Sequence, residues 1–441
     1  MKLPGFQNDE AGDYHVASEM IVHQRFPYMY TKPQGVIPGY LMTPFFLLIE
    51  DTVIASRLGN IFYAALSLIF LFCFVKSLFP GGKLPYFYIV FTAFHPNFIL
   101  SARIGSETRT ILMLFEALFL FFIYRWYKTG SVLRLVIAFL ALGMGFASHI
   151  CFAWFIVAMA ILFVLFRPEK HILVNQNFLS RILKFYGPAM AALLIGASPY
   201  IYFFLRENLL LNWVLKGLLV TEAGVNNLAY FQNLKIAWKN FVAIVQGSYI
   251  FTNWRIELES FYNSARCFVS FFLIFVFSFV WLALSLFFKK SNGGSGKKKK
   301  VFLLLTVLLI LAQSPFTLTQ VASYHLLMLV PFVTLIMVFG FSDFTNFIKN
   351  KTIYLGLNLV FISLMLVQSL VFISRYYDAI YATGGKKVFT DAVYALSDWL
   401  VLRPELKLVC VDNRFDFSLS AITKGKINGE DRTAEFEQFL S

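Results

Sequence analysis

About ten apolar segments follow one another along the chain and are separated by polar connections. Because a membrane-spanning helix needs about 20 apolar residues, these segments predict transmembrane helices. The block 133–166 is too long for one crossing, so we divide it at Ser148-His149 into two short spans. The predicted spans are 53–75, 84–100, 108–126, 133–148, 150–166, 184–204, 267–288, 301–321, 325–343 and 352–373.

The connections are of two kinds, and this difference assigns the sides of the membrane. Short connections rich in Lys and Arg lie in the cytoplasm by the positive-inside bias, and they cover residues 76–83, 125–134, 167–184, 289–300 and 349–351. The external side receives the longer, mixed-charge connections. Residues 291–296 (SNGGSG) and the lysines 297–300 predict a flexible linker that ends in a solvated basic cluster.

Composition supports a membrane protein and argues against a soluble one. Hydrophobic residues make up 59% of the 441 residues and charged residues 14%, against about 25% in a soluble chain. The net charge of +14 comes from the loops between spans, so it does not indicate nucleic-acid binding. The four cysteines form no disulfide framework.

Two regions are expected. Residues 1–373 form a membrane-embedded domain with external loops 1–52 and 205–266, and residues 374–441 form an external C-terminal segment. In that segment, Asp391 to Leu400 predicts an amphipathic helix and Leu406 to Asp412 a strand, as in a small, incomplete α/β unit. The chain is expected to start outside, so one N-terminal span is expected to be missing.

The N-terminal external segment contains an acidic pair, Asp9-Glu10. If residues 11–24 are helical, the pair lies at the positive end of that helix, where a carboxylate stays ionised and can act as a general base. The alternative is a plain N-cap in a polar loop.

A second external connection, 101–109, holds Arg103, Glu107 and Arg109 at the mouth of two spans. An arginine there could hold a phosphate, and Glu107 could be a second carboxylate or a metal ligand. The alternative is a structural role, in which an Arg–Glu pair closes a turn.

Other candidates are weaker. Arg57 near the outer end of its helix could bind a phosphate, or it could snorkel to the interface. A lone histidine such as His149 more often has a structural role than a functional one. Glu116 in mid-span is expected to face the bundle interior with a partner. Aromatic residues in the loop 205–266 suit either an acceptor sugar or interfacial anchoring.

In combination, these residues resemble the C-type membrane glycosyltransferases, and among them the bacterial and archaeal relatives of the protein O-mannosyltransferases and the lipid A aminoarabinose transferases. The motifs are Asp9-Glu10-x-x-Asp13-Tyr14-His15-x-Ala17, Pro38-Gly39-Tyr40, Ala55-Ser56-Arg57-Leu58, His95-Pro96, Ser101-x-Arg103-x-x-x-Glu107 and Tyr324-His325 to Pro331. The resemblance implies an all-α bundle of about ten transmembrane helices. It also implies an enzyme that takes a sugar from a polyprenyl phosphate and transfers it on the external face of the cell membrane.

The resemblance also implies roles for residues. Asp9 matches the catalytic base and Glu10 its neighbour, while Arg103 and Glu107 match a second external motif. Lys32 matches a lysine near the lipid phosphate, although this chain has Lys-Pro-Gln where the family has Lys-Pro-Pro. We group the candidates as catalytic (Asp9, Glu10), donor-phosphate-binding (Arg103, Lys32, Arg57), metal-binding or supporting (Glu107, His325, Tyr324) and acceptor-side (Tyr14, His15, Asp13).

The expected reaction is a single inverting displacement onto a hydroxyl of a lipid, glycan or protein acceptor. A carboxylate takes the hydroxyl proton, and Arg, Lys or a divalent metal ion, the candidate cofactor, meets the charge on the leaving phosphate. The alternatives are a transporter or flippase of lipid-linked sugars, a ligase of whole glycans, and an inactive relative. The absence of a visible internal repeat and the position of the charges at the outer boundary argue against transport.

Overall fold

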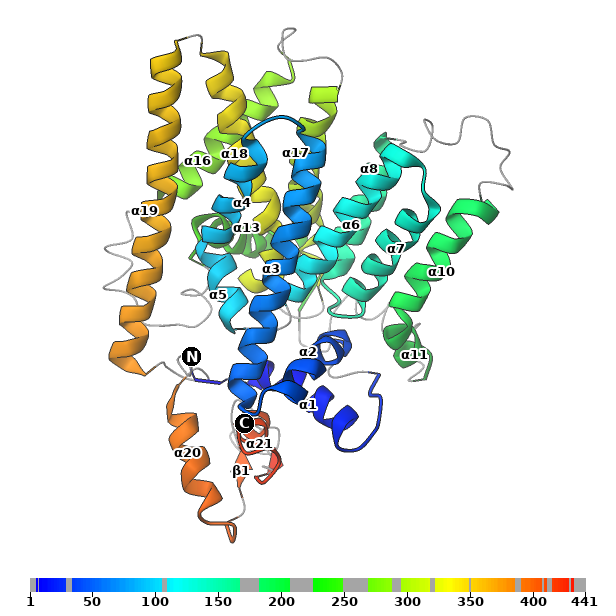
Figure 1. Cartoon of the computed structure of the whole chain (residues 1–441), viewed down its shortest axis with the longest axis vertical. Coiled ribbons are helices and arrows are strands. Elements are labelled where there is room, and N and C mark those ends of the chain that lie inside the picture. Colours follow the sequence, from blue (N-terminus) through cyan, green and yellow to red (C-terminus); the bar gives the residue numbers. More distant parts are fainter. Residues whose placement is uncertain are drawn as a thin grey trace.

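The computed structural model is a helical bundle with a small mixed unit at one end (Figure 1). It describes residues 5–6, 8–28, 34–104, 109–166, 182–206, 225–248, 269–287, 295–317, 322–348, 350–384, 390–406, 408–410, 415–427 and 430–431. The elements are α1 Asn8–Ile21, α2 Ile37–Leu48, α3 Thr52–Leu78, α4 Leu84–Phe94, α5 Pro96–Ile104, α6 Arg109–Thr129, α7 Val132–Phe146, α8 Phe152–Phe166, η3 Ile182–Tyr186, α10 Gly187–Gly196, α11 Ser198–Arg206, α13 Tyr230–Gln246, α16 Val269–Ser285, α17 Ser295–Gln313, η5 Ser323–Leu329, α18 Val330–Phe347, α19 Lys351–Thr383, α20 Ala392–Val401, β1 Val409–Cys410, α21 Phe415–Ile422 and β2 Glu430–Asp431.

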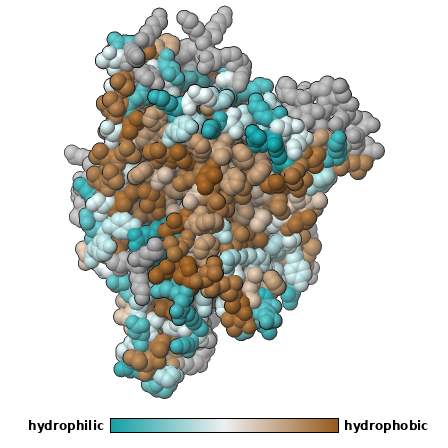
Figure 2. Space-filling view, viewed as in Figure 1, coloured by the Kyte–Doolittle hydropathy of each residue, from teal (hydrophilic) through white to brown (hydrophobic). Residues whose placement is uncertain are grey.

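The surface has an apolar band around the middle of the bundle and polar ends (Figure 2). In Figure 1, α1, α2, α20 and α21 lie at the lower end, and the connection from α3 to α4 and the lysine-rich start of α17 lie at the upper end. Of the long helices, α18 is almost wholly enclosed and α19 is mostly exposed at the edge of the bundle. The predicted all-α membrane architecture is confirmed at this level.

The prediction of about ten spans is confirmed only in part. Within the described residues, four helices are long and apolar enough to cross a membrane, Thr52–Leu78, Thr110–Thr129, Tyr324–Phe347 and Leu355–Thr383. A fifth candidate is the pair Leu183–Gly196 and Ser198–Arg206, which is bent by 66°. The remaining apolar helices are shorter, among them α7, α8 and the described part of α16.

Local sequence explains one of these differences. The predicted span 84–100 is broken into α4 and α5 at His95-Pro96, since the residue before a proline disfavours helical geometry. The apolar block 133–166 divides into α7 and α8 around Ser148-His149, as predicted. The last span is longer than predicted, because α19 continues past residue 373 to Thr383.

Two glycines allow α7 and α10 to pack closely. A Cβ at Gly143 would lie 2.2 Å from the Leu193 carbonyl oxygen, and one at Gly196 would lie 2.6 Å from the Leu140 carbonyl oxygen. Small residues let helix backbones approach in a membrane. These positions therefore fix how α10 lies against α7.

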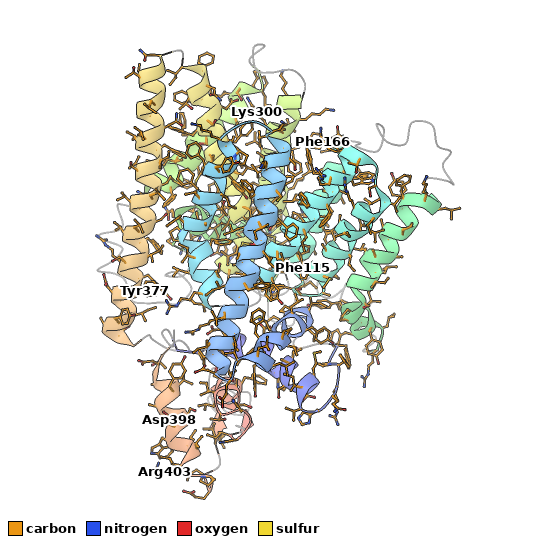
Figure 3. The ribbon with its side chains drawn as sticks, viewed as in Figure 1. Phe115, Phe166, Lys300, Tyr377, Asp398 and Arg403 are labelled. Carbon is orange, nitrogen blue, oxygen red and sulfur yellow. The ribbon has the colours of Figure 1, made fainter. Side chains whose placement is uncertain are left out.

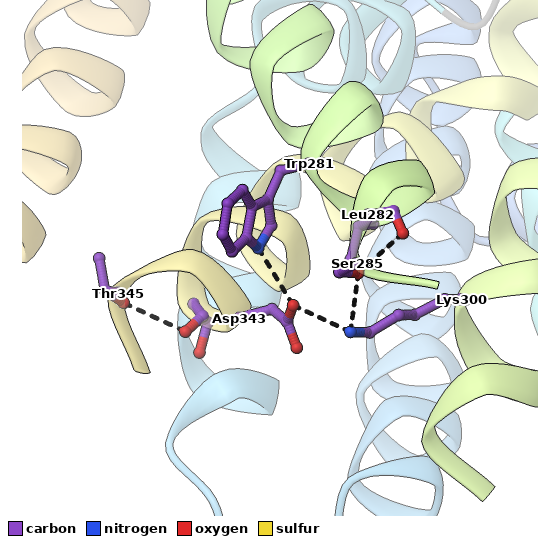
Figure 4. Close-up of polar contacts among 7 residues, drawn as sticks. Trp281, Leu282, Ser285, Lys300, Asp343 and Thr345 are labelled. Atoms are coloured by element: carbon purple, nitrogen blue, oxygen red, sulfur yellow. Dashed lines mark hydrogen bonds and ion pairs between the residues drawn. The ribbon is translucent and has the colours of Figure 1, made fainter. Parts of the chain in front are cut away.

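The lysines 297–300 are helical and not part of a flexible linker, because α17 begins at Ser295. Lys297 and Lys298 are exposed, as predicted for a solvated basic cluster, but the prediction is wrong for Lys300. Lys300 is 1% exposed, and its Nζ donates to Ser285 Oγ and to Asp343 Oδ2, each at 2.9 Å (Figure 4). Trp281 Nε1 donates to the same carboxylate oxygen at 3.1 Å. Lys300 therefore joins α16, α17 and α18 at the upper end of the bundle.

The C-terminal segment contains the predicted helix and strand. The predicted helix is α20, and β1 lies within the predicted strand. The strands β1 and β2, which α21 connects, pair in parallel with Val409 opposite Glu430 and Cys410 opposite Asp431. This small β–α–β unit lies against the N-terminal helix: Phe6, Ala11 and Val53 form a buried cluster with Ala421 of α21. The N-terminal helix and the C-terminal unit are therefore in contact.

Candidate functional site

A buried ion pair joins α1 to α3 at the lower end of the bundle. Arg57 Nε donates to Glu10 Oε1 at 3.1 Å and Arg57 Nη2 donates to Glu10 Oε2 at 3.2 Å. Both side chains are 0% exposed. Such a two-pronged pair is strong and directional, so it fixes the first turn of α1 against α3. Arg57 does not snorkel to the interface, which corrects that alternative.

The sequence around the pair sets this geometry locally. Asp51 caps α3 by accepting the Ile54 backbone N–H at 3.0 Å, so the helix starts at Thr52 and Arg57 lies in its second turn. Glu10 lies in the first turn of α1, where the helix dipole favours a negative charge. Asp9 precedes it in the same turn, although its side chain lies outside the described residues.

Tyr394 of α20 lies beside this pair. Burial raises the pKa of its phenol, the positive charge of Arg57 opposes that rise, and the charges of Glu10 and Asp51 add to it. The phenol therefore stays protonated at neutral pH. The C-terminal segment thus contributes a neutral hydroxyl group close to the buried carboxylate.

The residues that flank the connection 105–108 lie at the same end of the bundle. Thr110 Oγ1, at the start of α6, donates to Asn60 Oδ1 at 3.0 Å, one turn beyond Arg57 on α3. Arg103, at the end of α5, donates to the Tyr377 hydroxyl and lies 4.8 Å from the centre of that ring on α19, which Figure 3 labels near the lower end of the helix. Both ends of the connection 105–108 are therefore held at the end of the bundle that carries the Glu10–Arg57 pair.

A histidine pair forms a separate group. The rings of His149 and His325 lie 5.6 Å apart, and both side chains are buried. Tyr324 lies 4.2 Å from His325, and Gln34 forms a β-bridge with His149. The bridge anchors the chain two residues after Lys32.

A close approach reinforces that anchor. The Gly35 N–H donates to the Ser148 carbonyl at 3.0 Å, and a Cβ at Gly35 would lie 1.8 Å from the Ala147 oxygen. Only a glycine fits here. The predicted supporting residues Tyr324 and His325 therefore lie beside His149. The segment Gln34-Gly35, which follows Lys32, is attached to the chain at the same place.

The acceptor-side candidates lie along α1. Asp13 is 5% exposed, and Tyr14 packs edge-on against Phe46 with ring centres 5.4 Å apart. Burial raises the pKa of Tyr14, and a hydrogen bond with Ser18 partly opposes this. His15 is exposed and lies 5.4 Å from the Phe417 ring of α21.

Some candidates cannot be placed. Lys32 and Glu107 lie outside the described residues, as does most of the loop 205–266, and the side chain of Arg109 is not described. Among the described residues, no three His, Cys, Asp or Glu side chains gather as metal ligands would. Lys32, Glu107 and the metal therefore stay predictions.

Glu116 departs from its prediction. It faces the bundle interior as expected and is 0% exposed. However, neither carboxylate oxygen has a hydrogen-bond partner within the described part of the chain. The predicted partner is therefore absent from those residues.

Three residues of the site were missed by the sequence reasoning. Asn60 could have been predicted, because it is a polar residue inside an apolar run and lies one helical turn from Arg57. Tyr377 and Tyr394 carried no such signal, because nothing in a single sequence relates them to residues nearly 300 and 400 positions earlier.

The comparisons agree with this picture. Residues 32–203 match the family model described as dolichyl-phosphate-mannose-protein mannosyltransferase. No curated protein matches the chain in sequence. Among solved structures, ArnT from Cupriavidus metallidurans in the apo state has the same fold, with a TM-score of 0.58 and 11% identity over 99% of this chain and 87% of that one.

The same protein bound to undecaprenyl phosphate matches with a TM-score of 0.55 and 11% identity over 98% of this chain and 86% of that one. The sequence match and the shared fold rest on different observations, one on residues 32–203 and the other on nearly the whole chain. Together they confirm the predicted resemblance to the membrane glycosyltransferases of the mannosyltransferase and aminoarabinose-transferase type.

Proposed function

We propose that this protein transfers a single sugar from a polyprenyl-phosphate donor to a hydroxyl of a lipid, glycan or protein acceptor on the external face of the membrane. The family match and the fold support the donor class, and one of the similar structures was solved with undecaprenyl phosphate. The observation that carries the proposal is the buried Glu10–Arg57 pair, because it fixes the first turn of α1, which contains Asp9.

The two acidic residues have different roles in this proposal. Both oxygens of Glu10 accept hydrogen bonds from Arg57, so Glu10 is poorly suited to take a proton and acts as a positioning residue. Asp9, its neighbour at the positive end of α1, is the general base. Arg57 is then a partner of Glu10, and the donor phosphate is left to Arg103 and Lys32.

The reaction follows from these roles. The acceptor hydroxyl oxygen attacks the anomeric carbon while Asp9 takes the hydroxyl proton. The bond from that carbon to the phosphate oxygen breaks, and the polyprenyl phosphate leaves with the electron pair. Attack opposite to the leaving group inverts the anomeric centre, and the cationic side chains stabilise the charge that grows on the phosphate.

A transfer assay tests the proposal. Membranes containing the protein receive radiolabelled polyprenyl-phosphate sugars, and label in the acceptor fraction is measured for the wild type, Asp9→Asn and Glu19→Gln. Glu19 lies on the same helix at its other end, so it is a matched control. We expect Asp9→Asn to lose transfer by about 100-fold or more, as for a general base, and the control to keep it.

Two outcomes would overturn the proposal. Transfer by Asp9→Asn at the wild-type rate would remove Asp9 as the base. No transfer from any donor, with the donor lipid instead crossing the bilayer, would make the protein a flippase.

A further inference from the structure

A groove opens between α3, α6, α8 and α17 towards the upper, Lys-rich end of the bundle, away from the candidate site. It has a volume of ≈ 490 Å³. Its walls are apolar and largely aromatic, with Phe74 from α3, Phe119 from α6, Phe163 and Phe166 from α8 and Phe302 from α17. Figure 3 labels Phe166 at the upper end of α8.

Three lysines line the same groove: Lys128 from α6, and Lys298 and Lys299 from α17. The ammonium of Lys128 lies 5.6 Å from the centre of the Tyr124 ring, and that of Lys299 lies 4.8 Å from the Phe79 ring. No ion pair with Asp or Glu involves any of the three within the described residues. Lys128 and Lys299 are also close enough to repel each other.

The neighbouring lysine shows that this arrangement is not a general property of the run. Lys300 turns into the bundle and pairs with Asp343, whereas Lys298 and Lys299 line the groove. A topology signal requires only that lysines lie on the cytoplasmic side. It does not require that lysines from two helices meet at the end of one aromatic groove.

The ligand that fits both features is an anionic amphiphile. Apolar walls suit a hydrocarbon chain, and a cluster of lysines at the membrane surface suits a phosphate-bearing headgroup. The volume lies within the usual range of ligand sites. A small soluble anion would use the lysines and leave the aromatic walls without a function.

We propose that this groove binds one anionic phospholipid of the cytoplasmic leaflet, with the headgroup phosphate at Lys128, Lys298 and Lys299 and an acyl chain along the aromatic walls. The site is separate from the sugar-transfer site, and it ties α6, α8 and α17 together at the cytoplasmic surface.

Native mass spectrometry of the purified full chain in detergent tests this inference, with phosphatidylglycerol and phosphatidylcholine as probes. We expect the wild type to retain one phosphatidylglycerol in preference to phosphatidylcholine. One lysine near an anionic headgroup contributes about fivefold in affinity, so the variant Lys128→Ala/Lys298→Ala/Lys299→Ala should bind phosphatidylglycerol about a hundredfold more weakly. Lys297→Ala is the matched control, since Lys297 is exposed on the same helix and does not line the groove.

A second variant tests the apolar part. Ile123→Trp narrows the groove and keeps all three lysines, so it should also lose the retained lipid, while its thermal unfolding without added lipid confirms that it is folded. Free glycerol phosphate should not displace the lipid.

Three results for the protein variants and the lipid probes would overturn the inference. These are equal phosphatidylglycerol affinity of the triple variant and the wild type, an equal loss in Lys297→Ala, or retention of phosphatidylcholine as tightly as phosphatidylglycerol. Displacement by free glycerol phosphate would instead indicate a soluble anion site and would also overturn it.

Discussion

The buried pair between Glu10 and Arg57 can be broken by substitution of either residue, and the stability of the two variants should depend differently on pH. Arg57→Met leaves a buried carboxyl group, and Glu10→Met leaves a buried guanidinium group. A carboxyl group can escape the cost of a buried charge by taking a proton, whereas a guanidinium group keeps its charge at every accessible pH. The two variants should therefore be equally damaging near neutrality and unequally damaging in acid.

The magnitude follows from the burial. Both side chains are 0% exposed, so the removal of one partner should cost about 3–5 kcal/mol in unfolding free energy. In Arg57→Met, protonation of Glu10 limits that cost. The limit is about 3.7 kcal/mol at pH 7 and about 1.6 kcal/mol at pH 5.5, from an unfolded-state pKa of about 4.3 and about 1.36 kcal/mol per unit.

The two variants should differ in how their stability changes with pH. In Arg57→Met the folded state holds a proton that the unfolded state has lost, so the stability of this variant falls as pH rises from about 4.3. Between about pH 5.5 and 7 it should lose about 2 kcal/mol relative to the wild type. The unfolding free energy of Glu10→Met should stay below that of the wild type by a constant amount over this pH range, because Arg57 cannot release its proton.

The assay is unfolding by sodium dodecyl sulfate in mixed micelles at both pH values. Glu50→Gln is the control, because it removes an exposed pair with Lys424 at 3.6 Å and should change little. The double variant Glu10→Met/Arg57→Met should be more stable than either single variant, since no charge is left buried. The reasoning is refuted if the double variant is the least stable, or if Glu10→Met recovers in acid as much as Arg57→Met.

Three further changes test other parts of the structure. Gly35→Ala places a methyl group 1.8 Å from the Ala147 oxygen, so we expect the segment after Lys32 to shift and transfer activity to fall at least tenfold, measured as initial rate. Lys300→Met leaves Asp343 without its cation, but that carboxylate is 16% exposed; we expect a loss of about 1–3 kcal/mol in unfolding free energy. Tyr394→Phe should matter little at pH 7 and should flatten the loss of stability above about pH 10, because burial raises the pKa of the folded phenol while the unfolded phenol ionises near 10.

Apolar length and local signals predicted much of the fold. The run 53–75 lies within α3, and the division of 133–166 at Ser148-His149 corresponds to the break between α7 and α8. Apolar content did not predict whether a segment is one straight helix. The 66° bend after Gly196 and the break at His95-Pro96 depend on packing and on the proline, not on hydropathy.

The site was predictable to the extent that its residues are local. The acidic pair in the first turn of a helix could be expected from Asp9-Glu10 and the helix that follows. The partner of Glu10 could not, since an arginine inside a span has several reasons to be there. Lys300 shows the same limit, because a run of four identical lysines gives no reason for one of them to turn inward to Asp343.

The surroundings of Glu10 combine residues from distant parts of the chain. Arg57 comes from α3, and Tyr394 comes from α20, which follows the whole bundle in sequence. Phe6 and Val53 pack with Ala421 of α21 in the same region. Because Tyr394 and Ala421 are part of these surroundings, the environment of the acidic pair is complete only when the C-terminal unit packs against α1. The C-terminal segment is therefore part of the same structural unit as the acidic pair, and a substitution in α21 that weakens its contact with α1 should act on the pair without touching it.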